Sequence, residues 1–130
     1  MFSPDGRWIA YTSNEGGQND VYVQPFPANG NRQQVSKEGG THPVWRADGK
    51  ELFFLRTSDG MLMSVPIPAT TQWDQGTTKA LFISGATRSI PSQQYAATRD
   101  GSRFLVSSRP RELTVEPLTV VVNWLAAVQK

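Results

Sequence analysis

An aspartate followed by a glycine occurs three times in similar surroundings, at Asp5-Gly6, Asp48-Gly49 and Asp100-Gly101. Aspartate carboxylates bind Ca²⁺, but a calcium site needs several oxygen ligands close together, as in D-x-D-x-D-G loops. Each of these aspartates instead stands alone before its glycine. Asp-Gly is also a favoured pair in tight hairpin turns, where the backbone needs a positive φ. We therefore predict that the three pairs build turns and that they hold no metal.

His42 is the only histidine of the chain and stands just before Pro43. Nucleophilic catalysis needs a serine or cysteine, a base and an orienting acid. The sequence contains no cysteine and no G-x-S-x-G motif that would present a serine. The acidic residues in turn and loop contexts show no pair of the glycosidase kind; they are Glu51, Asp59, Asp74, Glu112 and Glu116. We expect no enzymatic activity and no cofactor, and we interpret His42 as a candidate surface contact at a loop or channel mouth.

Arg109 and Arg111 form a short basic stretch near the C-terminus, together with Arg103. Pro110 and Glu112 interrupt it, and no aromatic residues alternate with the arginines as in proteins that bind single-stranded nucleic acid. The net charge of the chain, +2, is also mild for a nucleic-acid partner. We predict a solvated loop with Arg109 and Arg111 as candidate contacts, and no nucleic-acid binding.

The four tryptophans fall into two groups. Trp8, Trp45 and Trp124 lie in apolar patterns typical of strands, which predicts that they belong to a core. Trp73 lies in the polar stretch TTQWDQGTT of residues 70–78. A tryptophan in a polar loop suits contact with a protein or small ligand, so Trp73 is the fourth candidate contact residue.

The Asp-Gly pairs belong to a longer phrase that the chain repeats: FSPDGRWIAY from Phe2, WRADGKELFF from Trp45 and ATRDGSRFLV from Ala97. The copies are 43 and 52 residues apart, counted from Phe2, Trp45 and Ala97. A period of about 40–50 residues with several short strands is typical of the blades of a β-propeller. The sequence predicts an all-β fold of about three four-stranded antiparallel blades, of which the first and last are incomplete.

The predicted blade units span residues 1–40, 41–90 and 91–124, and a short helical tail follows at 125–130. Within them, apolar and β-branched runs bounded by polar, glycine-bearing turns predict the strands. These are residues 7–13, 21–26 and 32–36, then 42–45, 51–56, 61–67 and 80–84, then 95–98, 103–107 and 119–124.

The strand after each Asp-Gly pair is apolar at successive positions in all three copies. The equivalent sets are Ile9, Leu52 and Phe104, then Ala10, Phe53 and Leu105, then Tyr11, Phe54 and Val106. An isolated antiparallel sheet with one wet face would alternate apolar and polar residues instead. We therefore predict that both faces of these strands are buried, as stacking of blades requires.

The two ends of the chain differ in this pattern. Phe2 corresponds to the end of an innermost strand, and the third unit lacks a fourth strand. From this we expect a C-terminal part of a longer protein. Three blades leave two open blade faces, and two copies with twofold symmetry can complete a six-bladed ring. The absence of cysteine excludes disulfides, and no run of about 18 apolar residues predicts a transmembrane helix.

The phrases SPDGRWIAY and ADGKELFF resemble the WD40-like, PD40 repeat of TolB-type β-propellers. VYVQPFP, PVWRADGKELFFL, MLMSVPI, ATRDGSRFLV and LTVVVNWLAAVQK resemble the C-terminal propeller of bacterial multidomain proteins that carry a serine/threonine kinase or a regulator domain. The resemblance implies a non-catalytic module that recognises proteins or small ligands, and it favours an extracytoplasmic location. The alternative that it leaves open is an accessory, sensory or gating propeller of a kinase or a prolyl-oligopeptidase-like peptidase.

Overall fold

The structure is a computed structural model that describes residues 1–28, 30–68, 78–85 and 94–107. All regular elements in these residues are β-strands, and all their pairings are antiparallel. Since the described part of the chain contains no helix, none there could cross a membrane. The predicted strand 119–124 and the predicted helical tail 125–130 lie outside the described residues.

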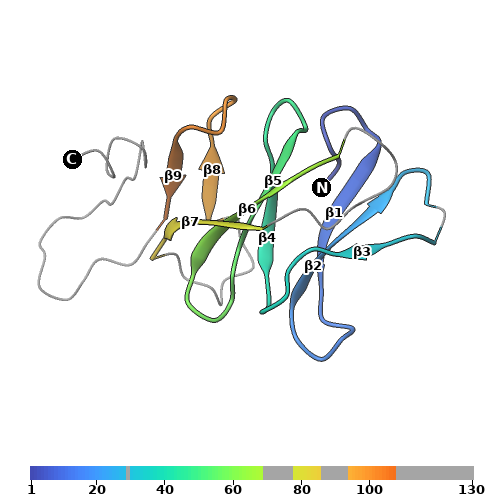
Figure 1. Ribbon diagram of the computed structural model, residues 1–130, viewed down its shortest axis with the longest axis horizontal. Helices are drawn as coiled ribbons and strands as arrows, with labels where there is room; N and C mark the ends of the chain where they lie inside the picture. The colour runs from blue at the N-terminus through green and yellow to red at the C-terminus, as the bar shows by residue number, and fades with distance from the viewer. Residues whose placement is uncertain (29, 69–77, 86–93, 108–130) are drawn as a thin grey trace, which may run out of the picture.

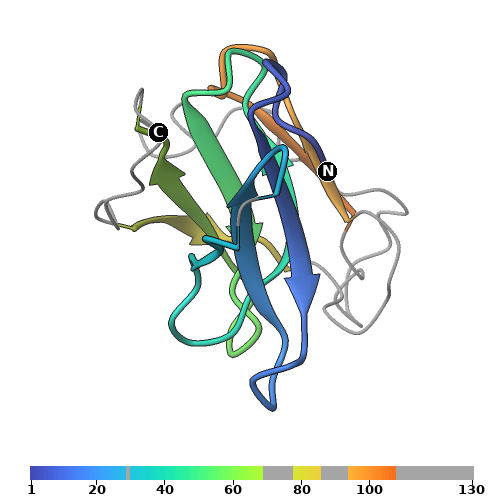
Figure 2. The same cartoon turned by 90° about the vertical axis from the view of Figure 1, so that its right-hand side faces the viewer.

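The strands form three separate sheets, which stand side by side in Figure 1 with the first sheet at the right and the third at the left. The first sheet has the order β1 (Trp8–Ser13), β2 (Asp20–Pro25) and β3 (Gln33–Gln34). The second has the order β4 (Thr41–Trp45), β5 (Glu51–Leu55), β6 (Met61–Pro66) and β7 (Lys79–Ile83). The third consists of β8 (Tyr95–Ala97) and β9 (Phe104–Val106). Figure 2 looks along this row from the side of the first sheet.

The innermost positions of the sheets are linked to one another by side-chain hydrogen bonds. In the first sheet, Phe2 forms an isolated bridge to Ile9 and so takes the place that β4 and β8 hold in the other two sheets. Trp45 on β4 donates its indole N–H to the carbonyl of Met1 at 3.1 Å. Tyr95 on β8 likewise donates its hydroxyl to the carbonyl of His42 on β4 at 2.7 Å. Each sheet is thereby fastened to the one before it.

The second sheet separates two apolar cores. We call the side of a sheet that faces the next sheet in chain order its forward face, and the opposite side its backward face. Successive side chains of a strand point to opposite faces, so Leu52 and Phe54 of β5 pack backward and Phe53 and Leu55 pack forward. The core between the first and second sheets contains Trp8, Ala10, Val21, Val23, Val35, Trp45, Leu52, Phe54, Met63 and Val65. The core between the second and third sheets contains Phe53, Leu55, Leu62, Tyr95, Phe104 and Val106.

The prediction that both faces of all three repeated strands are buried is correct only for the second sheet. In β5, Leu52, Phe53 and Phe54 are all buried. In β9, Phe104 and Val106 are buried, whereas Leu105 between them is 55% exposed. In β1, Ala10 is buried, whereas Ile9 and Tyr11 are only partly covered. The reason is that a flanking sheet has a neighbouring sheet on one side only among the described residues.

The all-β, antiparallel fold class predicted from the repeats is confirmed, and the open outer sheets fit a fragment of a propeller. The observed strands differ from the predicted ones by a few residues. β3 covers only Gln33–Gln34 instead of residues 32–36, and β2 ends at Pro25 instead of at residue 26. The unit boundaries 1–40, 41–90 and 91–124 stay a prediction.

Candidate binding surfaces

The three repeated Asp-Gly pairs form turns of one design. In the turn between β4 and β5, Gly49 donates its N–H to the carbonyl of Arg46 at 2.8 Å, and its φ is 73°. The carboxylate of Asp48 accepts the backbone N–H of Lys50 at 2.9 Å and two hydrogen bonds from the Arg46 guanidinium, at 2.7 and 2.8 Å. Asp5 and Asp100 accept the N–H two residues ahead in the same way. The prediction that these pairs build turns is confirmed.

The hydrogen bonds within each turn also lower the pKa of its aspartate. The side chain of Arg46 and the backbone N–H of Lys50 lower the pKa of Asp48 to about 2. Thr98 and Ser102 lower the pKa of Asp100 to about 2, and Ser3 and Arg7 do so for Asp5. The ionised form of each carboxylate is therefore stabilised by hydrogen bonds from its own turn. Among the described residues, no group of three or more histidine, cysteine, aspartate or glutamate side chains is placed to hold a metal ion.

The three turns lie along the same edge of the row of sheets (Figure 1). A Cβ atom on Gly49 would be 3.5 Å from the Pro4 ring, and one on Gly101 would be 2.7 Å from Cδ of Arg46. Each turn therefore contacts the next, and Arg46 reaches from the second turn to the third. This edge is a structural seam between blades.

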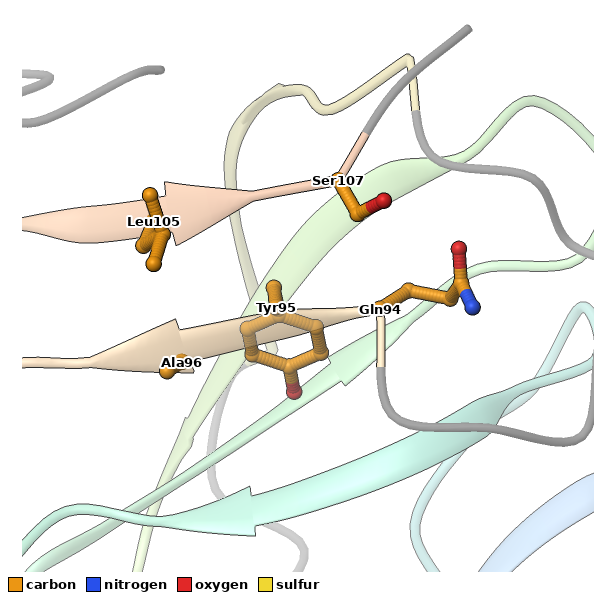
Figure 3. Close-up of a pocket in the computed structure, with 5 residues that line it drawn as sticks. All are labelled: Gln94, Tyr95, Ala96, Leu105 and Ser107. Carbon is orange, nitrogen blue, oxygen red and sulfur yellow. The ribbon is translucent and has the colours of Figure 1, made fainter. Parts of the chain in front are cut away.

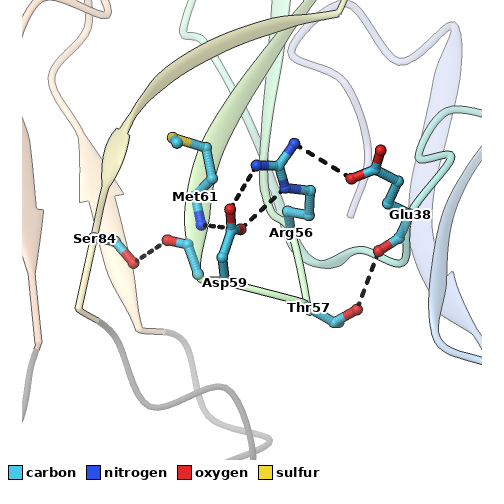
Figure 4. A network of polar contacts seen from close by, with 7 residues as sticks. Glu38, Arg56, Thr57, Asp59, Met61 and Ser84 are labelled. Atoms are coloured by element: carbon cyan, nitrogen blue, oxygen red, sulfur yellow. Dashed lines mark hydrogen bonds and ion pairs between the residues drawn. The ribbon is translucent and has the colours of Figure 1, made fainter.

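A second polar network joins loops at the opposite end of β5 (Figure 4). The guanidinium of Arg56 donates to both carboxylate oxygens of Asp59, at 3.0 and 2.5 Å, and forms an ion pair with Glu38 at 3.5 Å. The hydroxyl of Thr57 donates to the Glu38 carbonyl at 3.5 Å. Because Glu38 lies in the connection between β3 and β4 and Asp59 lies between β5 and β6, the network joins the segment between the first and second sheets to a turn of the second sheet.

His42 lies on β4 at a bulge, where the pairing with β5 shifts between Thr41 and Val44. Its φ of 56° is the only positive value among the non-glycine residues described. Its Nδ1 lies 2.9 Å from the Thr41 hydroxyl, and its carbonyl accepts the hydrogen bond from Tyr95. Burial raises the pKa of the Tyr95 hydroxyl well above its usual range, so that group stays a donor. His42 is thus at the junction of two inner strands, and its contact role stays a prediction.

The other three predicted contact residues, Trp73, Arg109 and Arg111, lie outside the described residues. Of the tryptophans predicted for the core, Trp8 and Trp45 are buried between the first and second sheets, as expected, and Trp124 lies outside the described residues.

The backward face of the first sheet is an open surface with aromatic side chains. Phe2 and Phe26 are 56% and 49% exposed and pack edge to face, with ring centroids 5.1 Å apart. Tyr11 and Tyr22 stand opposite each other on β1 and β2 and stack at 5.8 Å. The guanidinium of Arg32 lies over the Tyr22 ring at 5.1 Å, which adds a cation–π contact at the margin of this face.

The forward face of the third sheet is the second open surface. Leu105 projects from it, and Ala96 beside it on β8 is exposed. These two residues, with Gln94, Tyr95 and Ser107, line a hollow of about 220 Å³ (Figure 3). The hollow is lined mostly by apolar groups, and the amide of Gln94 and the hydroxyl of Ser107 lie on its side away from Leu105 and Ala96 (Figure 3).

No protein-family model and no curated protein matches this chain. A solved structure does: the crystal structure of TolB from Acinetobacter baumannii superimposes with a TM-score of 0.62 over 84% of this chain, at 19% sequence identity. This chain has a TolB-like β-propeller fold. It spans 26% of the length of that TolB chain. At this identity the likeness concerns the fold, and the PD40 repeat and the link to a kinase or regulator stay predictions.

The TolB-like fold explains why sequence reasoning predicted burial on both faces of all three repeated strands, although it also counted two open blade faces. In a propeller each blade covers its neighbours, so apolar residues on both faces indicate core positions. The same pattern at the first and last described sheets leaves those residues exposed. The number of copies is the signal that predicted the open faces, because a row of three sheets has two outer faces.

Proposed function

We propose that this chain is a non-catalytic β-propeller module that recognises proteins through its open sheet faces. The observation that carries the proposal is the exposed aromatic surface of the first sheet, with Phe2 and Phe26 at its centre. Contiguous exposed apolar side chains are typical of interaction surfaces. Aromatic residues are enriched in such surfaces because they bury a large area and lose little conformational freedom.

Several charged side chains of the described residues hold the turns of the sheets in place instead of facing a ligand. The repeated aspartates are occupied within their own turns, and Arg46 and Arg56 are paired with carboxylates. Recognition is therefore assigned to the sheet faces, with the hollow beside Leu105 as a place for a small ligand or a partner's side chain. His42, Trp73, Arg109 and Arg111 remain further candidate contacts.

Photo-crosslinking in cells that express the protein tests this proposal. A benzophenone amino acid replaces Phe2, and in a matched control it replaces Ile83, which has the same exposed fraction of 56% but lies at the end of β7. We expect a discrete protein adduct from position 2 and none from position 83. The proposal is wrong if position 2 gives no adduct, or if both positions give the same adducts.

A second candidate function is an accessory, sensory or gating propeller of a multidomain enzyme of the serine/threonine kinase or prolyl-oligopeptidase kind. The observation that favours it is the resemblance of VYVQPFP, PVWRADGKELFFL and LTVVVNWLAAVQK to the C-terminal propeller of bacterial multidomain proteins. The reading frame upstream of Met1 distinguishes the two candidates. A catalytic domain encoded in frame would favour the accessory role, and a stop codon would contradict it.

A further inference from the structure

The three sheets use equivalent positions for equivalent contacts, and this allows the open faces to be compared with the filled ones. Counted from the aspartate of each turn, Ala10, Phe53 and Leu105 are equivalent. Ala10 packs forward against the second sheet, and Phe53 packs forward against the third. Leu105 points forward in the same way, but no sheet of the described residues lies in front of it and it is 55% exposed. Among the described residues, the third sheet thus presents a forward half of a blade interface without a facing sheet.

The first sheet ends in the matching backward half. Ile9, Leu52 and Phe104 are equivalent by the same count. Leu52 packs backward into the core between the first and second sheets. Phe104 packs backward into the core between the second and third sheets, where its ring centroid is 5.0 Å from that of Phe53. Ile9 points backward and is only partly covered.

The rest of that backward face also consists of blade-interface residues. Three aromatic residues of this face have equivalents in the second sheet that pack into the core between the first and second sheets. Phe2 corresponds to Trp45, Tyr11 to Phe54 and Phe26 to Ile67. An exposed face that repeats the composition of a buried one is suited to another sheet of the same kind.

We propose that a second copy of this chain covers these faces, with the first sheet of each copy packed on the third sheet of the other. One chain carries both halves of the interface, so two copies related by a twofold axis satisfy both open faces at once. This inference rests on the proposed function, because it names the partner of the same surfaces. The closed arrangement is the six-bladed ring that two copies of three blades can complete.

The internal interfaces predict which residues meet. The Phe53–Phe104 contact between the second and third sheets corresponds to Leu105 of one copy against Ile9 of the other. Val106 packs beside Phe53 and Leu55, and its equivalent in the first sheet is Tyr11. Tyr11 is therefore placed over the hollow beside Leu105 and Ser107. An aromatic ring with a polar tip suits a hollow that has a mostly apolar lining and polar groups on one side.

Sedimentation velocity of the full chain at micromolar concentration tests the association. We expect a species of twice the chain mass of 14.4 kDa. Leu105→Glu should abolish it, because a charge would be buried between two sheets. Ile83→Glu is the matched control, since Ile83 is equally exposed but lies on neither open face, and it should leave the dimer intact. A monomeric wild-type chain, or equal behaviour of the two variants, would overturn the inference.

Thiol crosslinking tests the pairing without relying on a disruptive variant. The chain has no cysteine, so single substitutions report one position each. We expect a short thiol-to-thiol crosslinker to join Leu105→Cys to Ile9→Cys when the two variants are mixed, and neither variant to itself. Crosslinking of each variant to itself with equal yield, or no product in the mixture, overturns the pairing. If the purified chain is monomeric while position 2 photo-crosslinks to another protein, this inference fails and the proposed function stands.

Discussion

The second sheet and the two flanking sheets carry the same repeated phrase, but they differ in what covers it. Phe53 on β5 is completely buried, whereas its equivalent on β9, Leu105, is 55% exposed. Leu52 is also completely buried, whereas its equivalent on β1, Ile9, is only partly covered. Sequence position within the repeat therefore determines strand, turn and direction of the side chain, while the neighbouring sheet determines burial.

The difference implies an uneven distribution of stability along the chain. The second sheet contributes to both cores, and each flanking sheet contributes to one. Elements with fewer buried apolar contacts open at lower free-energy cost. The outer faces of the flanking sheets are more accessible than the faces of the second sheet, and the proposed function assigns partner contacts to them.

The largest expected loss of stability comes from removing a large side chain from the core between the second and third sheets. Phe53→Ala should destabilise the chain by about 3–5 kcal/mol, because it removes a buried ring and leaves a cavity against Phe104. Phe26→Ala is the matched control on an open face and should cost about 1 kcal/mol or less. Urea unfolding at a concentration where the chain is monomeric measures both. Similar losses of unfolding free energy in the two variants would contradict the claim that the second sheet is more buried than the flanking sheets.

A smaller effect is expected where a turn packs against a neighbouring blade. Gly6 and Gly101 both have a positive φ, 72° and 71°, so alanine costs about 1–2 kcal/mol at either position. A Cβ on Gly6 meets nothing within 4 Å, whereas one on Gly101 lies 3.2 Å from Cζ of Phe53 as well as close to Arg46. Gly101→Ala should therefore cost about 1–3 kcal/mol more than Gly6→Ala. Equal unfolding free energies of the two variants would show that the seam between turns is loose.

The smallest expected effect is the pH dependence of the exposed turns. Asp5, Asp48, Asp59 and Asp100 have pKa values lowered from 3.8 to about 2 in the folded chain. Stability from these turns is present above pH 3.8 and is lost as pH falls through about 2. The thermal midpoint should drop across this window, and Asp48→Asn should show a smaller drop than the wild-type chain. An unchanged slope in Asp48→Asn would mean that its turn does not contribute.

Local chemistry made most of the fold predictable. Asp-Gly turns depend on a few neighbouring residues, as the Asp48 hydrogen bonds show, and the strands on either side follow from apolar runs. The repeat then supplied the architecture, since a strand pattern at this period is typical of blades. For these reasons β5 and β6 were predicted within one residue at each end.

Burial and backbone detail were less predictable, because both depend on distant parts of the chain. Leu105 has the same local pattern as Phe53, and only the absence of a covering sheet among the described residues separates them. The positive φ of His42 arises at a bulge that the hydroxyl of Tyr95 contacts from the third sheet, and a residue before proline gives no signal of it. Of the four predicted contact residues, only His42 is described.

The most direct test of the account compares Leu52→Ala with Leu105→Ala in chemical denaturation of the dilute, monomeric chain. The two changes remove the same atoms from strands that follow equivalent turns, but Leu52 is buried and Leu105 is on an open face. We predict a loss of about 2–5 kcal/mol for Leu52→Ala and a change within about 0.5 kcal/mol for Leu105→Ala. Equal losses would contradict the claim that the outer face of the third sheet is free for a partner.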